Sequence, residues 1–161
     1  MRILVDADAC PGKHIIENIG KKYNLEVIMY CDVNHILNSD YSKIIYADSH
    51  FQSVDMKIAN EIKALDIAVT QDFGVAAMVL SKKAFAISPK GYIYSNENID
   101  RLLFERHLSH KARKSGKKTS NPKKRNNEDD ERLFYNLERL IKDSETWNIL
   151  WVLAYNMFHV Y

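Results

Sequence analysis

The chain has 161 residues, which is enough for one ordinary domain with a sizeable hydrophobic core. Hydrophobic residues make up 46% of it and charged residues 27%, a balance typical of a globular protein and not of a disordered one. Because 23 basic and 21 acidic residues nearly cancel to a formal net charge of +2, the total charge identifies no class of partner.

The two cysteines, Cys10 and Cys31, come without a signal-peptide pattern at the amino terminus. This combination favours a reducing, cytoplasmic location over a disulfide scaffold. We expect both cysteines to be buried free thiols, with a metal or redox role as the alternative.

The first predicted strand is an apolar run, residues 3–5, that stops at two aspartates, Asp6 and Asp8. Pro11 then opens a helical pattern that continues to Tyr23. Side chains two apart on an extended segment project to the same side, so the two carboxylates converge only if something offsets their repulsion. A divalent cation is the simplest candidate. The alternative is that one aspartate caps the helix while the other is solvated.

Strands and helices alternate along the following stretch. Further strands are predicted at residues 25–31, 43–48, 66–72 and 84–87, and helices at residues 54–65, with Ser53 as N-cap, and 74–82. The Pro89-Lys90-Gly91 sequence predicts a turn, and hence a hairpin at the edge of the sheet. Alternating strands and single helices imply right-handed crossovers. The fold class is therefore α/β, a three-layer α/β/α domain with a mostly parallel central sheet.

The character of the chain changes beyond Asn96. Residues 98–114 form a helical and increasingly basic segment, and residues 128–143 form a second helical pattern. The apolar face of this second helix contains Leu133, Phe134, Leu137, Leu140 and Ile141. We take residues 1–143 as one domain with C-terminal helices and residues 144–161 as an apolar tail.

The tail from Trp147 to Tyr161 contains no Lys, Arg, Asp or Glu. It is too short for a confident membrane span, which needs about 20 residues, and we expect no membrane partner. Core packing, an oligomer contact and a terminus of unusual origin remain open as explanations. The sequence does not decide the oligomeric state.

Four carboxylates stand out by position. Asp6 and Asp8 follow the first strand, Asp72 follows the fourth, and Asp55 lies in the first turn of the helix before that strand. Carboxyl ends of neighbouring parallel strands lie side by side, so Asp6 and Asp72 meet if their strands are adjacent. Oxygen ligands without nearby His or Cys patterns favour Mg²⁺ or Mn²⁺, ions that activate water for phosphoryl displacement. Alternatively, Asp55 is present only because the helix dipole favours an acidic residue at a helix N-terminus, and Asp72 only starts the next helix.

A basic segment, residues 111–125, separates the last two helices and has no apolar residue larger than alanine. Its cations suit contact with a phosphate backbone, and the absence of interleaved aromatics argues against base stacking by the segment itself. The alternative is a solvated loop partly neutralised by the acidic residues 128–131. The proposed nucleic-acid-binding residues are Lys111, Arg113, Lys114, Lys117, Lys118, Lys123, Lys124 and Arg125.

Several motifs together resemble the bacterial YaiI/YqxD family, from Met1 to about Ile141. These are Val5-Asp6-Ala7-Asp8-Ala9-Cys10-Pro11, Ser53-Val54-Asp55, Val69-Thr70-Gln71-Asp72-Phe73-Gly74-Val75-Ala76-Ala77, Asn98-Ile99-Asp100-Arg101-Leu102-Leu103, and Pro122-Lys123-Lys124-Arg125 with Asp129-Asp130. That family is itself similar to the PIN-domain nucleases, whose parallel sheet carries an acidic centre for Mg²⁺ or Mn²⁺. The resemblance implies that Asp6, Asp55 and Asp72 are site residues, whereas Asp8 belongs to the narrower family pattern. Residues from Trp147 onward lie outside it.

The leading prediction is a cytoplasmic, PIN-like, divalent-metal-dependent nuclease that acts on phosphodiester bonds, most readily those of RNA. Asp6, Asp8, Asp55 and Asp72 are the predicted catalytic and metal-binding residues, with Mg²⁺ or Mn²⁺ as cofactor. Two alternatives from other classes remain: a nucleic-acid-binding or regulatory module that does not cleave, and a phosphatase for small substrates that uses the same chemistry.

Overall fold

The computed structural model describes residues 1–47, 53–115 and 123–158, with side chains up to residue 150. Its centre is a six-stranded sheet in the order β3-β2-β1-β4-β5-β6. The strands are β1 (Arg2–Asp6), β2 (Glu26–Asp32), β3 (Lys43–Ala47), β4 (Ile67–Val69), β5 (Phe85–Ile87) and β6 (Ile93–Tyr94). The first five are parallel and β6 is antiparallel to β5, which confirms the predicted mostly parallel sheet.

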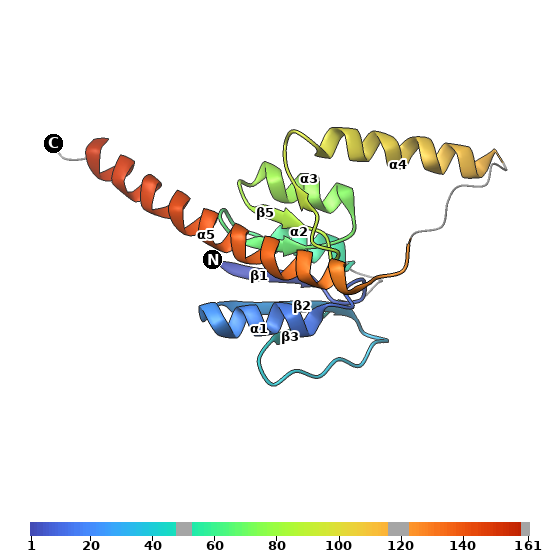
Figure 1. Cartoon of the computed structure of the whole chain (residues 1–161), viewed down its shortest axis with the longest axis horizontal. Helices are drawn as coiled ribbons and strands as arrows, with labels where there is room; N and C mark the ends of the chain where they lie inside the picture. Colours follow the sequence, from blue (N-terminus) through green and yellow to red (C-terminus); the bar gives the residue numbers. More distant parts are fainter. Residues whose placement is uncertain (48–52, 116–122, 159–161) are drawn as a thin grey trace.

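Five helices flank this sheet in the part of the chain that the structure describes: α1 (Lys13–Tyr23), α2 (Val54–Glu61), α3 (Phe73–Ser81), α4 (Ile99–Lys114) and α5 (Asn127–Phe158). Helices α1 and α5 lie together on one face, whereas α2 and α3 cover the other, and α4 extends past α3 (Figure 1). The three-layer α/β/α arrangement with C-terminal helices is therefore confirmed.

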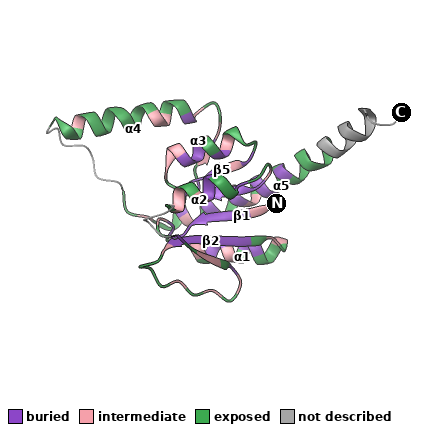
Figure 2. Ribbon diagram, turned by 180° about the vertical axis from the view of Figure 1, so that it is seen from behind, coloured by how far each residue is buried: buried purple, intermediate pink, exposed green. Residues whose placement is uncertain are grey.

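Each face of the sheet has its own hydrophobic core, because the strands are buried on both sides. On the first face, α1 contributes Ile16 and α5 contributes Leu133 and Leu137. On the second face, Ile58 of α2 and Val75 of α3 pack on the opposite side of the strands. Figure 2 shows the central strands β1 and β2 as mostly buried and most of α4 as exposed. The sheet is thus a rigid platform, whereas α4 is a largely solvated arm.

Strand β1 lies at the point where the order of the strands reverses. The chain leaves β1 toward β2 and β3 on one side, and later returns to place β4 on its other side. In the parallel β1–β4 register, Val5 pairs with Val69, so Asp6 and Thr70 follow at the same level. Open α/β sheets bind ligands outside the carboxyl ends of the strands at such a reversal. The fold therefore places Asp6 at the favoured position for a site.

Several predicted boundaries differ from those observed. Helix α2 begins after Ser53, whose side chain accepts a hydrogen bond from Met56 N as predicted, but it ends at Glu61 and not near residue 65. Strand β4 ends at Val69, because the backbone N–H of Asp72 turns to the Thr70 hydroxyl at 3.0 Å. The end of the predicted strand 43–48 lies outside the described residues.

The predicted hairpin at the edge of the sheet is confirmed by the antiparallel pairing of β5 and β6. Gly91 in its turn has φ +80°, a conformation that glycine adopts without strain. A Cβ at this position would lie 2.3 Å from the backbone nitrogen of Leu133. The turn therefore packs directly on the start of α5.

Helix α5 continues without a break past residue 143 to Phe158 and projects beyond the sheet (Figure 1). The side chains of Trp147, Ile149 and Leu150 are exposed, so these three do not pack in the core of the chain. Within the described residues, no helix combines the length and the hydropathy needed to cross a bilayer.

Candidate functional site

Asp6 is the most deeply placed of the four carboxylates. It ends β1 and is buried, with 9% of its surface exposed, and its Oδ1 accepts one long hydrogen bond, 3.4 Å, from Ala9 N. Burial raises the pKa of Asp6 to about 6, and the negative charges of Asp55 and Asp8 add to this increase, whereas the backbone N–H groups of Ala9 and Asp8 only partly oppose it. The charge of Asp6 is therefore poorly compensated by the fold, a condition typical of functional sites.

Asp55 lies in the first turn of α2, on the same side of the sheet as α3. Burial raises its pKa, as does the charge of Asp72, whereas Arg106 acts in the opposite direction. The helix dipole of α2 alone would lower the pKa of an acid here. The net increase means that burial and the charge of Asp72 outweigh the opposing charge of Arg106 at Asp55.

Asp72 is the N-cap of α3, which confirms that it starts the helix after it. Its Oδ1 accepts hydrogen bonds from Gly74 N at 2.7 Å and Val75 N at 3.0 Å. Its Oδ2 accepts a hydrogen bond from Arg106 Nη1 on α4 at 2.7 Å. Burial raises the pKa of Asp72, but the guanidinium and the two backbone donors outweigh burial and lower the pKa overall. Asp72 is thus a stable anion that joins α3 to α4.

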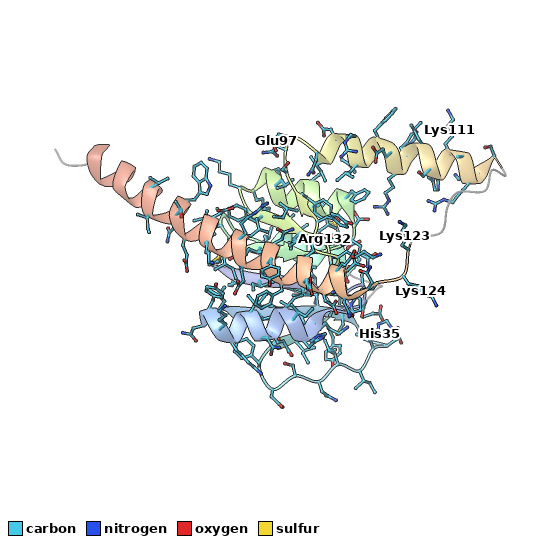
Figure 3. The ribbon with its side chains drawn as sticks, viewed as in Figure 1. His35, Glu97, Lys111, Lys123, Lys124 and Arg132 are labelled. Atoms are coloured by element: carbon cyan, nitrogen blue, oxygen red, sulfur yellow. The ribbon has the colours of Figure 1, made fainter. Side chains whose placement is uncertain are left out.

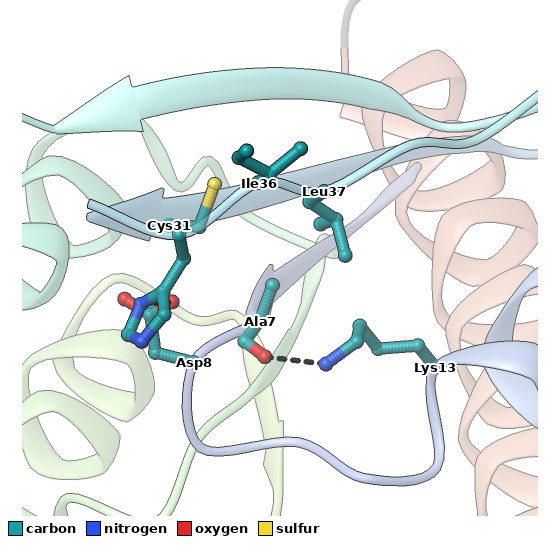
Figure 4. A pocket seen from close by; sticks show the side chains of 7 residues that line it. Ala7, Asp8, Lys13, Cys31, Ile36 and Leu37 are labelled. Atoms are coloured by element: carbon teal, nitrogen blue, oxygen red, sulfur yellow. Dashed lines mark hydrogen bonds and ion pairs between the residues drawn. The ribbon is translucent and has the colours of Figure 1, made fainter. Parts of the chain in front are cut away.

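Asp8 points to a different set of partners. Its Oδ1 lies 2.7 Å from His35 Nδ1, and its Oδ2 accepts a hydrogen bond from Asp32 N at 2.8 Å. Asp8 and His35 line an open cavity of about 170 Å³ at the carboxyl ends of β1 and β2 (Figure 4). On its far side, Lys13 Nζ donates to the carbonyl of Ala7 at 2.8 Å, the contact drawn in Figure 4. The side chain of Asp8 therefore acts on Asp6 only through its charge, because both of its oxygens contact residues at or after the end of β2, Asp32 and His35.

Neither Asp6 nor Asp8 caps α1. The N-cap of that helix is Gly12, which makes no side-chain capping hydrogen bond. The capping part of the alternative explanation is therefore wrong for both residues, whereas Asp8 is exposed to solvent as that alternative allowed for one of the pair. Gln71 connects the loop after β1 to the loop after β4, because its Nε2 donates a hydrogen bond to the Ala9 carbonyl at 2.6 Å.

The charges of Asp55 and Asp8 act on Asp6, and the charge of Asp72 acts on Asp55. The four side chains nevertheless do not form a closed set of metal ligands. Across residues 1–47, 53–115 and 123–158, no group of three or more His, Cys, Asp or Glu side chains is gathered tightly enough to hold a metal ion. The donor chemistry nevertheless fits a hard divalent cation, since Asp6, Asp55 and Asp72 offer only oxygen atoms. A cation would also relieve the repulsion that raises the pKa of Asp6 and Asp55.

The basic segment divides into three parts. Lys111, Arg113 and Lys114 form the last turn of α4. Lys117 and Lys118 lie outside the described residues. Lys123 and Lys124 are exposed, and Figure 3 shows them at the same end of the molecule as His35. The described lysines thus flank the end of the sheet that carries the aspartates, with Lys111 at the far end of the α4 arm (Figure 3).

Arg125 has a role within the fold. Its Nε lies 2.6 Å from Asp130 Oδ1, and its Nη1 donates to the Pro89 carbonyl at 2.5 Å. The side chain is only 17% exposed and packs against Gly12. Arg125 therefore joins α5 to the hairpin turn and the start of α1, and it has little surface left for a phosphate.

Sequence reasoning missed two partners of the site. Arg106 follows Asp72 by 34 residues and His35 follows Asp8 by 27, and both lie in segments whose pattern indicated only a helix or a polar loop. The basic character of residues 98–114 was a weak signal for Arg106. No local pattern singles out His35, because its pairing depends on how the loop after β2 folds back.

Both cysteines are buried free thiols, as predicted. Burial raises the pKa of Cys10 to about 11, and burial together with the charges of Asp8 and Asp32 raises the pKa of Cys31. A thiol needs a lowered pKa to be reactive or to bind a metal near neutral pH. These cysteines therefore contribute to packing.

Comparison with known proteins identifies relatives of this chain. A "UPF0178 protein" of Clostridium novyi (strain NT) is 66% identical over 145 residues, which cover 90% of this chain and 97% of the relative. One from Clostridium tetani (strain Massachusetts / E88) is 66% identical over 141 residues, 88% of this chain and 97% of the relative. One from Lachnoclostridium phytofermentans (strain ATCC 700394 / DSM 18823 / ISDg) is 48% identical over 145 residues, with coverages of 88% and 97%.

No solved structure gives a significant match. The family model described as "Uncharacterized BCR, YaiI/YqxD family" matches residues 4–143, a range that includes all four aspartates and the basic segment. With this match and relatives that align over most of their length, the chain belongs to the YaiI/YqxD family.

Proposed function

We propose that this protein is a divalent-metal-dependent nuclease that hydrolyses phosphodiester bonds, with RNA as its substrate. The observation that carries the proposal is the environment of Asp6. A buried carboxylate stands at the reversal of strand order, and its pKa is raised to about 6 by burial and by Asp55 and Asp8. Uncompensated acidic groups at this position of an α/β sheet are typical of sites that bind a cation or a substrate.

Two groups of residues have separate roles in this proposal: the aspartates bind the metal ion, and the basic residues bind the nucleic-acid backbone. Asp6, Asp55 and Asp72 would hold Mg²⁺ or Mn²⁺, with Asp8 adding negative charge from its place beside His35. When bound, such an ion activates water and neutralises charge during in-line displacement at phosphorus. The exposed cations Lys111, Arg113, Lys114, Lys123 and Lys124 would hold the polyanionic backbone near these carboxylates. Lys117 and Lys118 extend the same basic run in the sequence.

One observation favours the non-catalytic alternative. Arg106 Nη1 already lies 2.7 Å from Asp72 Oδ2, so a positive charge is present at Asp72 without a metal ion. A protein in which this guanidinium takes the place of a cation would bind nucleic acid through its basic residues without cleaving it. The small-substrate phosphatase has no such observation in its favour.

The deciding experiment is cleavage of labelled single-stranded and structured RNA by the purified protein with Mn²⁺, Mg²⁺ or EDTA. We expect cleavage with either ion, none with EDTA, and none by the Asp6→Asn/Asp72→Asn variant. RNA binding without metal-dependent cleavage would replace the proposal by the non-catalytic module. Turnover of small phosphoesters that is indifferent to neutralising the basic segment would replace it by the phosphatase.

A second experiment tests the metal site itself. We expect Asp6→Asn and Asp72→Asn each to weaken Mn²⁺ binding, measured by calorimetry, by at least about tenfold. Asp100→Asn is the matched control, because Asp100 lies in the first turn of a helix like Asp55 but on α4. Unchanged Mn²⁺ affinity in both site variants would show that these carboxylates do not bind the ion.

A further inference from the structure

A second cavity, of about 400 Å³, opens beside Asp72. It is lined from three elements: Gln71 and Phe73 before and at the start of α3, the hairpin from Ser88 to Tyr94, and α4 near Arg101. Gln71 and Phe73 are the two sequence neighbours of Asp72. The cavity therefore adjoins the carboxylate site but belongs to the opposite side from the Asp8 and His35 cavity.

The walls of this cavity include three aromatic side chains, Phe73, Tyr92 and Tyr94. Phe73 and Tyr94 pack edge to face with their ring centroids 5.7 Å apart, which fixes both rings. Tyr92 is 56% exposed although it lines the cavity. The guanidinium of Arg132 stacks on the Tyr92 ring, 4.0 Å from its centroid, and Arg132 Nε donates to the Lys90 carbonyl at 2.8 Å. One face of Tyr92 is thus backed by a fixed planar cation, which leaves the rest of the ring for another planar group.

The cavity also lies between the two halves of the proposed nuclease site. On one side, the lining residues Gln71 and Phe73 flank Asp72 in the sequence. On the other, Lys90 Nζ donates to the carbonyl of Lys123 at 2.6 Å, which brings the hairpin turn to the basic residues Lys123 and Lys124. A polynucleotide that reaches from the aspartates to these lysines would pass over the hairpin. Arg101, 66% exposed at the wall formed by α4, adds a further cation.

We propose that this cavity binds a nucleobase of single-stranded RNA, stacked on Tyr92, in the nucleotide next to the phosphate at the aspartates. The position relative to cleavage rests on the proposed nuclease function, whereas the base binding does not. Stacking on an aromatic side chain is the usual way in which single-stranded nucleic acid is held without base pairing. The site thus supplies the aromatic contact that the basic segment lacks, and it selects unpaired over paired RNA, whose bases are already stacked.

The test compares two probes of equal length in EDTA, so that no cleavage is needed: a fluorescent adenosine oligoribonucleotide and an abasic ribose-phosphate oligomer. We expect Tyr92→Ala to weaken binding of the base-containing probe by about tenfold and to leave the abasic probe unchanged. Tyr92→Phe keeps the ring and should retain the wild-type affinity. Tyr135→Ala is the matched control, since Tyr135 is a 67% exposed tyrosine outside the cavity and should change neither affinity.

Three outcomes would overturn the proposal: no binding of either probe by the wild type, no effect of Tyr92→Ala, or an equal loss for both probes. The last would mean that Tyr92 acts only by supporting Arg132 and the local charge. Unfolding midpoints of all variants, measured alongside, identify any loss that comes from misfolding. If Tyr92→Ala is unstable, Tyr92→Leu takes its place, because it keeps an apolar side chain but removes the aromatic ring and should weaken binding of the base-containing probe alone. A base-specific effect of Tyr92 in a protein that never cleaves RNA would support the base site and reject the nuclease.

Discussion

The two ends of the β1–β4 strand pair differ in how the charge of a buried carboxylate is compensated. At the amino ends, Asp66 is 3% exposed and accepts hydrogen bonds from the backbone nitrogen of Arg2 at 2.8 Å and from its Nη2 at 2.6 Å. At the carboxyl ends, Asp6 is also buried, yet the nearest charges that act on its pKa are those of Asp55 and Asp8. Across the described residues, Asp6 forms no ion pair.

This difference shows which end of the sheet contributes to stability and which is available for function. The buried carboxylate of Asp66 is compensated, because its Oδ2 accepts two hydrogen bonds from the Arg2 guanidinium and its Oδ1 accepts one from the Arg2 backbone nitrogen. A buried carboxylate surrounded by like charges destabilises the fold unless a cation or proton joins it. The same two strands therefore carry a structural ion pair at one end and an uncompensated anionic site at the other.

Breaking the compensated end should have the largest effect. We expect Asp66→Ala to lower the free energy of unfolding by about 2–3 kcal/mol, because the Arg2 guanidinium and the backbone N–H of Lys63 lose their acceptor. Urea unfolding at pH 7 measures this change. Glu105→Ala is the control: its pair with Arg101 is exposed, so its loss should cost less than about 0.5 kcal/mol. Equal effects of the two variants would contradict the comparison.

Removing the charge of Asp6 at the uncompensated end should raise the free energy of unfolding. The ordinary pKa of an Asp is 3.8 and that of Asp6 is raised to about 6, so folding binds a proton between these values. Stability is therefore lost as the pH rises from about 4 to about 6. We expect Asp6→Asn, measured by urea unfolding without metal, to stabilise the protein by about 1–2 kcal/mol at pH 7.5 and hardly at all near pH 4. Destabilisation at pH 7.5 would show that the Asp6 charge is compensated after all.

The lysines of the basic segment should contribute to RNA binding, and exposed lysines elsewhere in the chain should not. We expect Glu substitutions at Lys117, Lys118, Lys123 and Lys124 to weaken binding of single-stranded RNA about tenfold, or about 1.4 kcal/mol, with a shallower dependence on salt. Glu substitutions at the exposed Lys63 and Lys142 are the control. Fluorescence anisotropy over a range of salt concentrations distinguishes them. An unchanged salt slope in the first variant would make the basic segment a solvated surface.

Substitution of Asp72 should change stability least, because this carboxylate lies at the site end of the sheet but its charge is compensated by Arg106. Its pKa is lowered by Arg106 and by the N-terminus of α3, so its charge contributes stability above the ordinary pKa and loses it as the pH falls. We expect Asp72→Asn to lower stability at pH 7 by about 0.5 kcal/mol, since asparagine still caps the helix and the ion pair is partly exposed. Thermal unfolding at pH 7 and at low pH measures this change, which should vanish at low pH.

Much of the fold followed from local pattern. Buried parallel strands between amphipathic helices leave apolar runs and helical spacing in the sequence, so most elements and the Ser53 cap were predictable. The boundaries of α2 and β4 were not, because the Thr70 hydroxyl and the neighbouring loops decide where those elements end. In the site, that carboxylates follow β1 and β4 was predictable. That Asp8 turns to His35 and that Arg125 is used inside the fold was not, since both depend on distant partners.

The sequence by itself determined the α/β class, the family, and the presence of acidic residues after the first and fourth strands, because these are properties of short segments. Only the tertiary structure decided that β4 lies beside β1, and that the charge of Asp55 acts on Asp6 and the charge of Asp72 on Asp55. It alone placed Arg106 on Asp72 and formed the aromatic cavity between Asp72 and Lys123. The physical reason is that strand order and side-chain pairing depend on how the whole chain buries its apolar surface, and no local pattern encodes that choice.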